Sequence, residues 1–385
     1  MRYRYSAGAD GKLEKKAVIY TCDEHGINFA DVDAEAISIL KRLKSAGFDS
    51  YIVGGAVRDL ILGKKPKDFD IVSAASPTRI KKIFRNSRII GRRFRLVHVY
   101  FEKRVFEVST FRSLKDGHTS NTFGTIEEDV LRRDFTLNAL YYDPDQQIVV
   151  DYVGGMNDIK KKQIKPIINI ADIFVDDPVR MIRAAKYAAK TGFNIPLNLK
   201  MKISSQSNLL ASISPSRLTE EIFKIIHSEK AAAIVDFLDK MGLYAFLQPQ
   251  AAQLMRKDAN FRKNYLQGLE NLKDTEDRRG QALGCLFYDY LESTGDWKPE
   301  PIENFREIFK NARSFVSPMN PPRYEMEFAL KKFLSAHGIT VKKPVPKPAE
   351  ERDPKIAGTK PKRKRRRRRK KGVGSRELGA GITGS

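Results

Sequence analysis

The sequence predicts an α+β protein: a mixed sheet with helices, followed by an all-helical part and a disordered basic tail. Up to about residue 155, short β-branched and aromatic runs alternate with helical periods. Helical periodicity alone then continues to about residue 340. The rest is rich in Pro, Lys and Arg and has too little apolar material to bury a core. We therefore expect a poorly ordered lead-in over 1–30, a head over 31–155, a helical neck over 156–230, a helical body over 231–340 and a tail over 341–385.

The head opens with a helix over residues 33–46, where apolar side chains recur at helical spacing and Gly47 follows as a stop. A further helix is expected over 77–84. Strands are expected where β-branched residues gather between turn residues, over 51–53, 69–72, 97–101, 105–109 and 148–153. Residues 112–125 are polar and contain two glycines, which predicts a mobile loop.

The most informative segment of the head is YIVGGAVRDLILGKKPKDFDIVS, residues 51–73. Gly54 and Gly55 open a short helix, where backbone N–H groups can approach phosphate oxygens. Asp68 and Asp70 then alternate with Phe69 as in a strand, so both carboxylates share one face. Adjacent carboxylates are hard oxygen ligands for Mg²⁺, which would neutralise and align a triphosphate. The combination predicts a nucleotidyl-transfer site, whereas either motif alone is also typical of a turn or a solvated strand edge.

Within the neck, DDPVRMIRAAKYAAKTGF (residues 176–193) predicts a helix in which Asp177 precedes Pro178 and Gly192 ends the helical period. Further helices are expected over 218–226, 231–240, 261–272, 280–291 and 324–336.

Charge predicts a polyanionic partner. The chain has 385 residues and a net charge of +24, and residues 341–385 contain 17 Lys and Arg against 4 Asp and Glu. The remainder is therefore basic as well, which indicates salt-sensitive binding. The densest run gives the candidate RNA-binding residues Lys362, Arg363, Lys364, Arg365, Arg366, Arg367, Arg368 and Arg369.

The sequence argues against a zinc enzyme or a triad-based enzyme and against a membrane or secreted protein. The chain has 2 Cys and 5 His without metal-site spacing, which argues against a zinc site or a histidine-centred triad. No apolar run is long enough for a membrane span, and the first residues lack the apolar core of a secretory signal. We expect a cytoplasmic protein with no membrane contact.

Three motifs in order, GGAVRDLILGKKPKDFD, EEDVLRRDFTLNALYY and DDPVRMIRAAKYAAKTGF, resemble the class II nucleotidyltransferases of the polymerase-beta superfamily. That family holds bacterial poly(A) polymerases and tRNA CCA-adding enzymes. Within it, GRRFRLVHV, VFEVSTFR and DYVGGMNDI are similar to the poly(A) polymerase branch. The resemblance implies a polymerase-beta-like nucleotidyltransferase head.

By this resemblance, the reaction is attack of an RNA 3′-OH on the α-phosphate of ATP, with pyrophosphate released. Asp68 and Asp70 would be catalytic and hold two Mg²⁺ ions, with Mn²⁺ as the alternative. The family position for a third catalytic carboxylate is Asp134. Glu107 is its competitor, because a neighbouring strand would turn that side chain toward the pair.

The resemblance also implies the nucleotide-binding residues. Gly54, Gly55, Arg58 and Arg133 would receive the triphosphate, and Asn138 would orient the ribose. Asp177, Arg180 and Arg183 share roughly one helix face and would read the base. Each has an ordinary structural alternative: a surface arginine, a surface amide or a helix cap.

The predicted function is therefore template-independent addition of AMP to RNA 3′ ends, within mRNA processing and transcription. The alternatives are a CCA-adding enzyme using CTP and ATP, and a non-catalytic RNA-binding protein. The expected partners are RNA 3′ ends, ATP and proteins of RNA degradation or RNA chaperoning, and the expected state is a monomer.

Overall fold

The computed structural model describes residues 2–7, 13–91, 95–102, 104–113, 122–272, 278–298 and 300–341. Three expectations fall outside these residues in whole or in part. They are the central residues of GRRFRLVHV, most of the loop expected over 112–125, and the basic tail with its candidate residues from Lys362 to Arg369.

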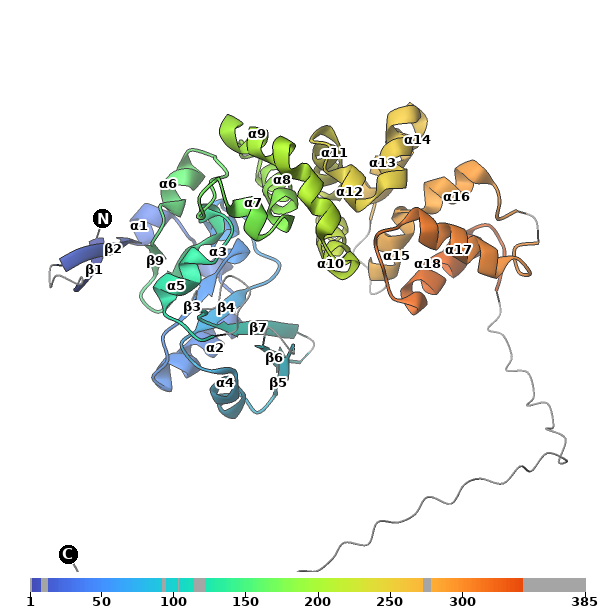
Figure 1. Ribbon diagram of the computed structural model, residues 1–385. Helices are drawn as coiled ribbons and strands as arrows, with labels where there is room; N and C mark the ends of the chain where they lie inside the picture. Colours follow the sequence, from blue (N-terminus) through green and yellow to red (C-terminus); the bar gives the residue numbers. More distant parts are fainter. Residues whose placement is uncertain are drawn as a thin grey trace, which may run out of the picture. The chain divides into compact units, whose positions relative to one another are not determined.

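The head is built on one mixed sheet (Figure 1), in the order β1-β2-β9-β8-β3-β4-β7-β6-β5 among the described residues. β4 and β7 run parallel, and the other neighbouring strands are antiparallel. The strands are β1 (Arg2–Ala7), β2 (Leu13–Tyr20), β3 (Ser50–Val53), β4 (Asp70–Ser73), β5 (Ser87–Ile90), β6 (Leu96–Phe101), β7 (Arg104–Thr110), β8 (Leu140–Asp143) and β9 (Ile148–Asp151).

The expectation of a poorly ordered lead-in over 1–30 is wrong. Val18 to Tyr20 of β2 pair with β9, and β1 continues the sheet beyond β2. The chain then forms α1 (Cys22–His25) and the 3₁₀ helix η1 (Phe29–Asp31). The His25 ring is buried and bonds the Gln147 carbonyl at 3.0 Å, so this segment is anchored to the sheet.

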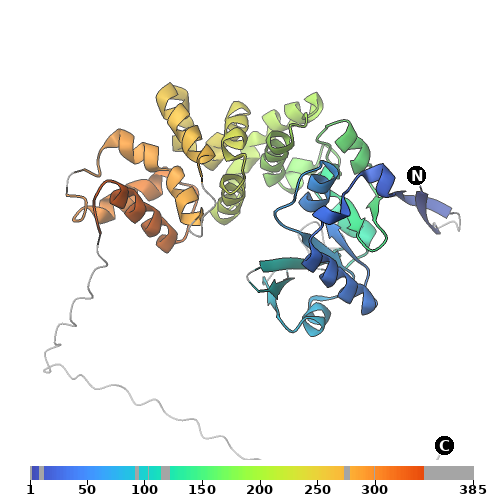
Figure 2. The same ribbon diagram turned by 180° about the vertical axis from the view of Figure 1, so that it is seen from behind.

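Helices lie against the sheet (Figures 1 and 2), and their apolar side chains share one core with apolar side chains of the strands. α2 begins after Asp33, whose side chain accepts from the N–H groups of Glu35 and Ala36, and it buries Ile39, Leu40 and Leu43 as its periodicity predicts. The helices of the head after η1 are α2 (Ala34–Ser45), α3 (Gly55–Ile61), α4 (Pro77–Ile83), α5 (Ile126–Leu131), the 3₁₀ helix η2 (Thr136–Asn138) and α6 (Gly155–Lys160).

The chain from α7 onward is helical, as expected. α8 follows Pro178 and ends at Gly192, which has a φ of +79°. Its buried face packs against α11. The elements are α7 (Ile173–Asp176), α8 (Val179–Thr191), α9 (Leu197–Gln206), η3 (Ser207–Ser212), α10 (Pro215–Ile226), α11 (Ala231–Lys240), α12 (Tyr244–Leu247), α13 (Pro249–Lys257), α14 (Ala259–Glu270), α15 (Arg278–Cys285), α16 (Tyr288–Thr294), α17 (Phe305–Phe315) and α18 (Arg323–Ala336).

Two features of this region differ from expectation. The helix expected over 280–291 is broken between α15 and α16, where Leu286 and Phe287 turn inward and are fully buried. Helices α9, α13 and α17 were not predicted. Within the described residues, no helix is long and apolar enough to span a bilayer.

Candidate active site

One pocket of about 1180 Å³ gathers almost every residue that the sequence nominates. Its walls come from the glycine turn before α3, the α3–β4 turn, the segment before η2, and helices α8 and α10. The predicted residues that line it are Gly54, Gly55, Arg58, Asp68, Asp70, Arg133, Asp134, Asn138, Asp177, Arg180 and Arg183. Glu107 does not line it. The lining has 14 Lys and Arg side chains against 8 Asp and Glu, so the pocket favours an anionic ligand.

The glycine turn brings backbone close to the carboxylates. Gly54 has φ +72° and ψ −135°, a conformation that residues with a Cβ rarely adopt. A Cβ added there would lie 3.7 Å from Oδ2 of Asp70. That distance is an ordinary van der Waals contact, so the backbone conformation, more than the available space, requires glycine at this position.

Asp68 and Asp70 are exposed while Phe69 between them is buried, as the alternation predicts. The pKa of Asp70 is raised to about 6, first because the pocket walls desolvate the carboxylate and then because Glu107 and Asp68 repel its charge. Solvent still reaches the side chain, so Asp70 is an accessible carboxylate in the pocket wall and not a core residue. A carboxylate crowded by like charge is stabilised by added positive charge, which either a proton or a bound cation can supply.

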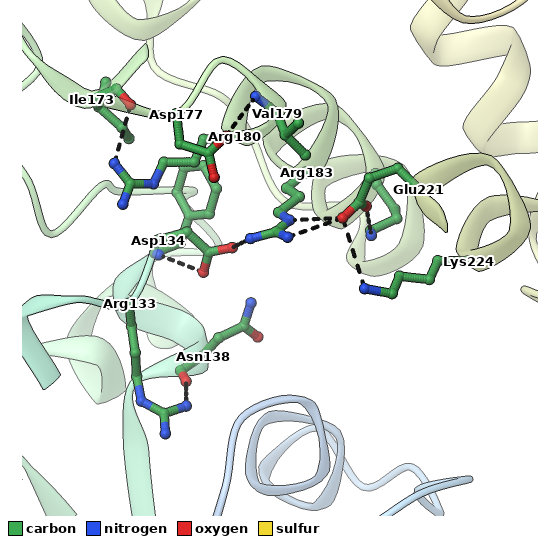
Figure 3. Close-up of polar contacts among 12 residues, drawn as sticks. Arg133, Asp134, Asn138, Ile173, Asp177, Val179, Arg180, Arg183, Glu221 and Lys224 are labelled. Atoms are coloured by element: carbon green, nitrogen blue, oxygen red, sulfur yellow. Dashed lines mark hydrogen bonds and ion pairs between the residues drawn. The ribbon is translucent and has the colours of Figure 1, made fainter. Parts of the chain in front are cut away.

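The two candidates for the third carboxylate lie in different surroundings. β4 runs parallel to β7 with Ile71 opposite Val108, which places Glu107 beside Asp70 on the neighbouring strand. Asp134 instead accepts a 2.8 Å bond from the Phe135 N–H and faces Arg183 at 3.7 Å (Figure 3).

Arg58 is buried and bonded within the protein. Its guanidinium donates to Oδ1 of Asp59 at 2.7 and 2.9 Å and to Oδ1 of Asn138 at 2.7 Å. Asp59 also pairs with Lys190 of α8 at 3.0 Å. Arg58 is therefore not a surface arginine, nor Asn138 a surface amide; together they hold α3 against η2.

Arg133 is bonded in a similar way. It donates to the Tyr141 hydroxyl at 3.0 Å, to the Asn138 carbonyl at 3.2 Å and to Asp129 at 3.0 Å. Burial would lower its pKa, but Tyr141 and Asp129 raise it, so the side chain is a permanent cation in the pocket wall.

The residues expected to read a base lie at the start of α8. Asp177 lies in an extended conformation just before Pro178, the N-cap of α8, and its side chain accepts from the N–H of Val179, the first residue of the helix, at 3.2 Å. Its two carboxylate oxygens also accept from Nη2 of Arg217 on α10, at 3.0 and 2.9 Å. Arg180 is buried and donates to the Ile173 carbonyl at 3.1 Å.

A cluster around Glu221 joins α8 to α10 (Figure 3). Glu221 accepts from Arg183 at 3.0 Å and from Lys186 at 2.8 Å, and Lys224 lies 3.8 Å away. Burial would raise the pKa of Glu221, but these cations lower it to about 2. Arg217 and Glu221 stand four positions apart on α10, a spacing typical of an ion pair within one helix. The structure instead pairs Arg217 with Asp177, just before α8, and Glu221 with Arg183 and Lys186 of α8.

A divalent cation fits the carboxylate pair. Among the described residues, no group of three or more His, Cys, Asp and Glu side chains is arranged to hold an ion alone. Mg²⁺ is commonly bound by one or two carboxylates together with substrate phosphates. Asp68 and Asp70, open to the pocket and mutually repelling, are suited to that arrangement.

Family comparisons match two parts of the chain. Residues 50–165 match the family described as the poly A polymerase head domain. Residues 192–255 match the one described as the probable RNA and SrmB-binding site of polymerase A.

Curated relatives include poly(A) polymerase I of Escherichia coli O6:H1, 44% identical over 54% of this chain and 48% of the relative. Poly(A) polymerase I of Haemophilus influenzae is 35% identical over 73% of this chain and 65% of the relative. A CCA-adding enzyme of Geobacillus kaustophilus is 35% identical over 60% and 59%. The chain thus spans about half to two thirds of the length of these relatives.

Among solved structures, the Bacillus stearothermophilus CCA-adding enzyme in complex with CTP superposes with a TM-score of 0.55 at 26% identity, covering 80% of this chain and 83% of that one. The Thermotoga maritima CCA-adding enzyme complexed with tRNA has a TM-score of 0.52 at 20% identity, over 85% and 88%, and supports the fold alone.

Proposed function

The chain belongs to the class II nucleotidyltransferases, and from that premise we propose that it adds AMP from ATP to RNA 3′ ends. The observation that carries the proposal is the glycine turn packed against Asp70 in the wall of a strongly basic pocket. The choice of AMP rests on the matches to poly(A) polymerases, which reach 44% identity, against 35% for the CCA-adding enzyme of Geobacillus kaustophilus.

In this proposal, Asp68 and Asp70 hold divalent cations, Mg²⁺ or Mn²⁺. Two ions held there would supply positive charge to the attacking 3′-oxygen and to the departing pyrophosphate. The Gly54–Gly55 turn leaves room for a triphosphate beside the carboxylates. Arg58 and Arg133 contribute fixed positive charge in the wall, because their protein partners hold them in place.

For the third carboxylate, we favour Glu107 over Asp134. The parallel register of β4 and β7 places Glu107 next to Asp70, and its charge already raises the pKa of that residue. Asp134 faces Arg183, so it is better placed to position a base-reading arginine.

Base selection is assigned to Asp177 and Arg180, with Arg217 as a positioning residue. A carboxylate can accept from the adenine amino group while a guanidinium donates to a ring nitrogen. Since Arg217 bonds both oxygens of Asp177, ATP must share that carboxylate with it or displace it.

The deciding experiment offers ATP or CTP, each with a generic oligo(A) primer and with a tRNA lacking its 3′ end. The proposal expects long tails from ATP alone on oligo(A). Strict completion of CCA on the tRNA would instead favour the CCA-adding alternative, which the CTP-complex structure motivates.

A second experiment separates catalysis from RNA binding. Asp68→Ala should lower AMP incorporation more than about 100-fold, beyond the usual cost of losing a residue that only supports a metal ligand. Glu303→Gln, an exposed carboxylate in the body, is the matched control and should retain full activity. Wild-type incorporation by Asp68→Ala would leave the non-catalytic RNA-binding alternative.

A further inference from the structure

Two segments that face each other carry lysines at the mouth of the pocket. The α3–β4 turn presents Lys64 and Lys65, and the junction of α10 and α11 presents Lys230; all three are exposed and line the pocket. An ion pair of 2.9 Å between Lys67 and Glu229 joins the same two segments, so they lie directly opposite each other. We call Lys64, Lys65 and Lys230 the rim lysines.

The rim lysines differ from the deeper cations in having no neutralising partner. Among the described residues, no carboxylate oxygen lies within 4.0 Å of their ammonium groups. Arg58, Arg133 and Arg183, by contrast, are each paired with a carboxylate of the protein. Ammonium groups without ion-pair partners repel one another, and a bound polyanion would relieve that repulsion.

The chemistry of lysine suits a repeating, mobile ligand. A lysine ammonium is a point charge on a flexible stem, whereas arginine imposes a fixed planar geometry. The backbone of a growing strand presents phosphates that shift by one nucleotide after every addition. Flexible cations follow such a shift without reading the base, and their contacts depend on salt.

We propose that the rim lysines bind the backbone phosphates of the last nucleotides of the RNA, guiding its 3′ end into the pocket between the two segments. This inference rests on the proposed function, because the polyanion is taken to be the RNA that receives AMP. The triphosphate is assigned to the interior, beside the buried glycine turn, and therefore not to the exposed rim.

The test compares full-length wild type with the triple variant Lys64→Ala, Lys65→Ala, Lys230→Ala in binding a single-stranded oligo(A) of about 20 nucleotides. Each phosphate contact contributes about 0.7 to the slope of log affinity against log salt for single strands, so the slope should become shallower by about 2. Between 50 and 200 mM salt, wild type should therefore lose about 20-fold more affinity than the variant.

The matched control is Lys41→Ala, Lys81→Ala, Lys82→Ala, which removes the same charge from exposed positions of α2 and α4 outside the pocket. Its slope should stay near that of wild type. If both triple variants flatten the slope equally, diffuse charge explains the binding and the inference is overturned.

Two measurements separate this inference from its alternatives. A raised KM for ATP in the rim variant with an unchanged RNA slope would assign the lysines to the triphosphate and overturn it. Repeating the binding series in the Asp68→Ala background removes any need for turnover. A slope difference there supports the rim contact even where AMP addition itself fails.

Discussion

Replacing Glu221 by Gln would leave Arg183 and Lys186 without the carboxylate that neutralises them. The Glu221 side chain is only 3% exposed, so solvent cannot take over that role. Removing one partner of a buried ion pair typically costs about 3–5 kcal/mol. The pKa gives a similar value: a shift from about 4.3 in the unfolded chain to about 2 corresponds to about 3 kcal/mol at neutral pH.

The sign of the pH dependence follows from that shift. Because folding lowers the pKa of Glu221, its stabilisation is fully present above about pH 4.3 and is lost as the pH falls toward 2. The difference in free energy of unfolding between wild type and Glu221→Gln should therefore be about 3 kcal/mol at pH 7 and shrink as the pH falls below about 4.

Urea unfolding at pH 7 and again below about pH 4 measures the difference in free energy of unfolding between wild type and Glu221→Gln. Hydrogen exchange shows whether the loss of stability lies in α8 and α10. Glu220→Gln is the matched control, since Glu220 precedes Glu221 on the same helix and is exposed; its cost should stay within about 0.5 kcal/mol. Equal effects of the two substitutions, or a difference independent of pH, would refute the reasoning.

Three further predictions concern the pocket. Since the pKa of Asp70 is raised to about 6, the rate of AMP incorporation at low Mg²⁺ should rise between pH 5 and 7. More Mg²⁺ should lower the pH at which the rate is half its maximum, because the ion and the proton compete for the carboxylate. A half-maximal pH that does not change with Mg²⁺ concentration would contradict this. Arg217→Ala should change the ratio of kcat/KM for ATP over CTP by several-fold while altering stability by less than about 1 kcal/mol, since the pair it breaks is partly exposed; an unchanged ratio would make Arg217 purely structural. Gly54→Ala should cost about 1–3 kcal/mol of stability and most activity, because alanine is strained at φ +72° and ψ −135°. Gly63→Ala, at the other end of α3 with open space around it, is the control and should keep its activity.

The sequence predicted correctly those elements whose structure depends only on residues close to one another in the chain. The α2 helix, the Gly54–Asp70 segment and the end of α8 at Gly192 all depend on periodicity and glycine geometry within a few residues. The β1 and β2 strands were missed although Arg2 to Tyr5 alternate between basic and aromatic side chains, because both strands are rich in charged residues. Pairing of β1 with β2 and of β2 with β9 supplies what propensity does not.

The partners within the site could not be predicted in the same way. The Arg217–Asp177 pair joins residues 40 positions apart, and the place of Glu107 beside Asp70 depends on the register of two strands. Helical spacing alone would pair Arg217 with Glu221, four positions further along α10. A signal was present, since arginines and carboxylates recur at the starts of both α8 and α10, but only the packing of the two helices shows which ones meet.

The pairing of the pocket arginines bears on how a nucleotide is recognised. Arg58, Arg133 and Arg183 all donate to protein oxygens, so a triphosphate or base that contacts them must compete with or add to existing bonds. A hydrogen bond to a charged group contributes about 1.5–3 kcal/mol net, and exchanging one such partner for another returns little of it. The fixed arginines therefore orient the nucleotide and supply a positive electrostatic potential, but add little to its binding free energy. Tight binding of the substrates would depend on charged groups that have no ion-pair partner among the described residues, namely Asp68 and Asp70 toward a metal and the rim lysines toward RNA.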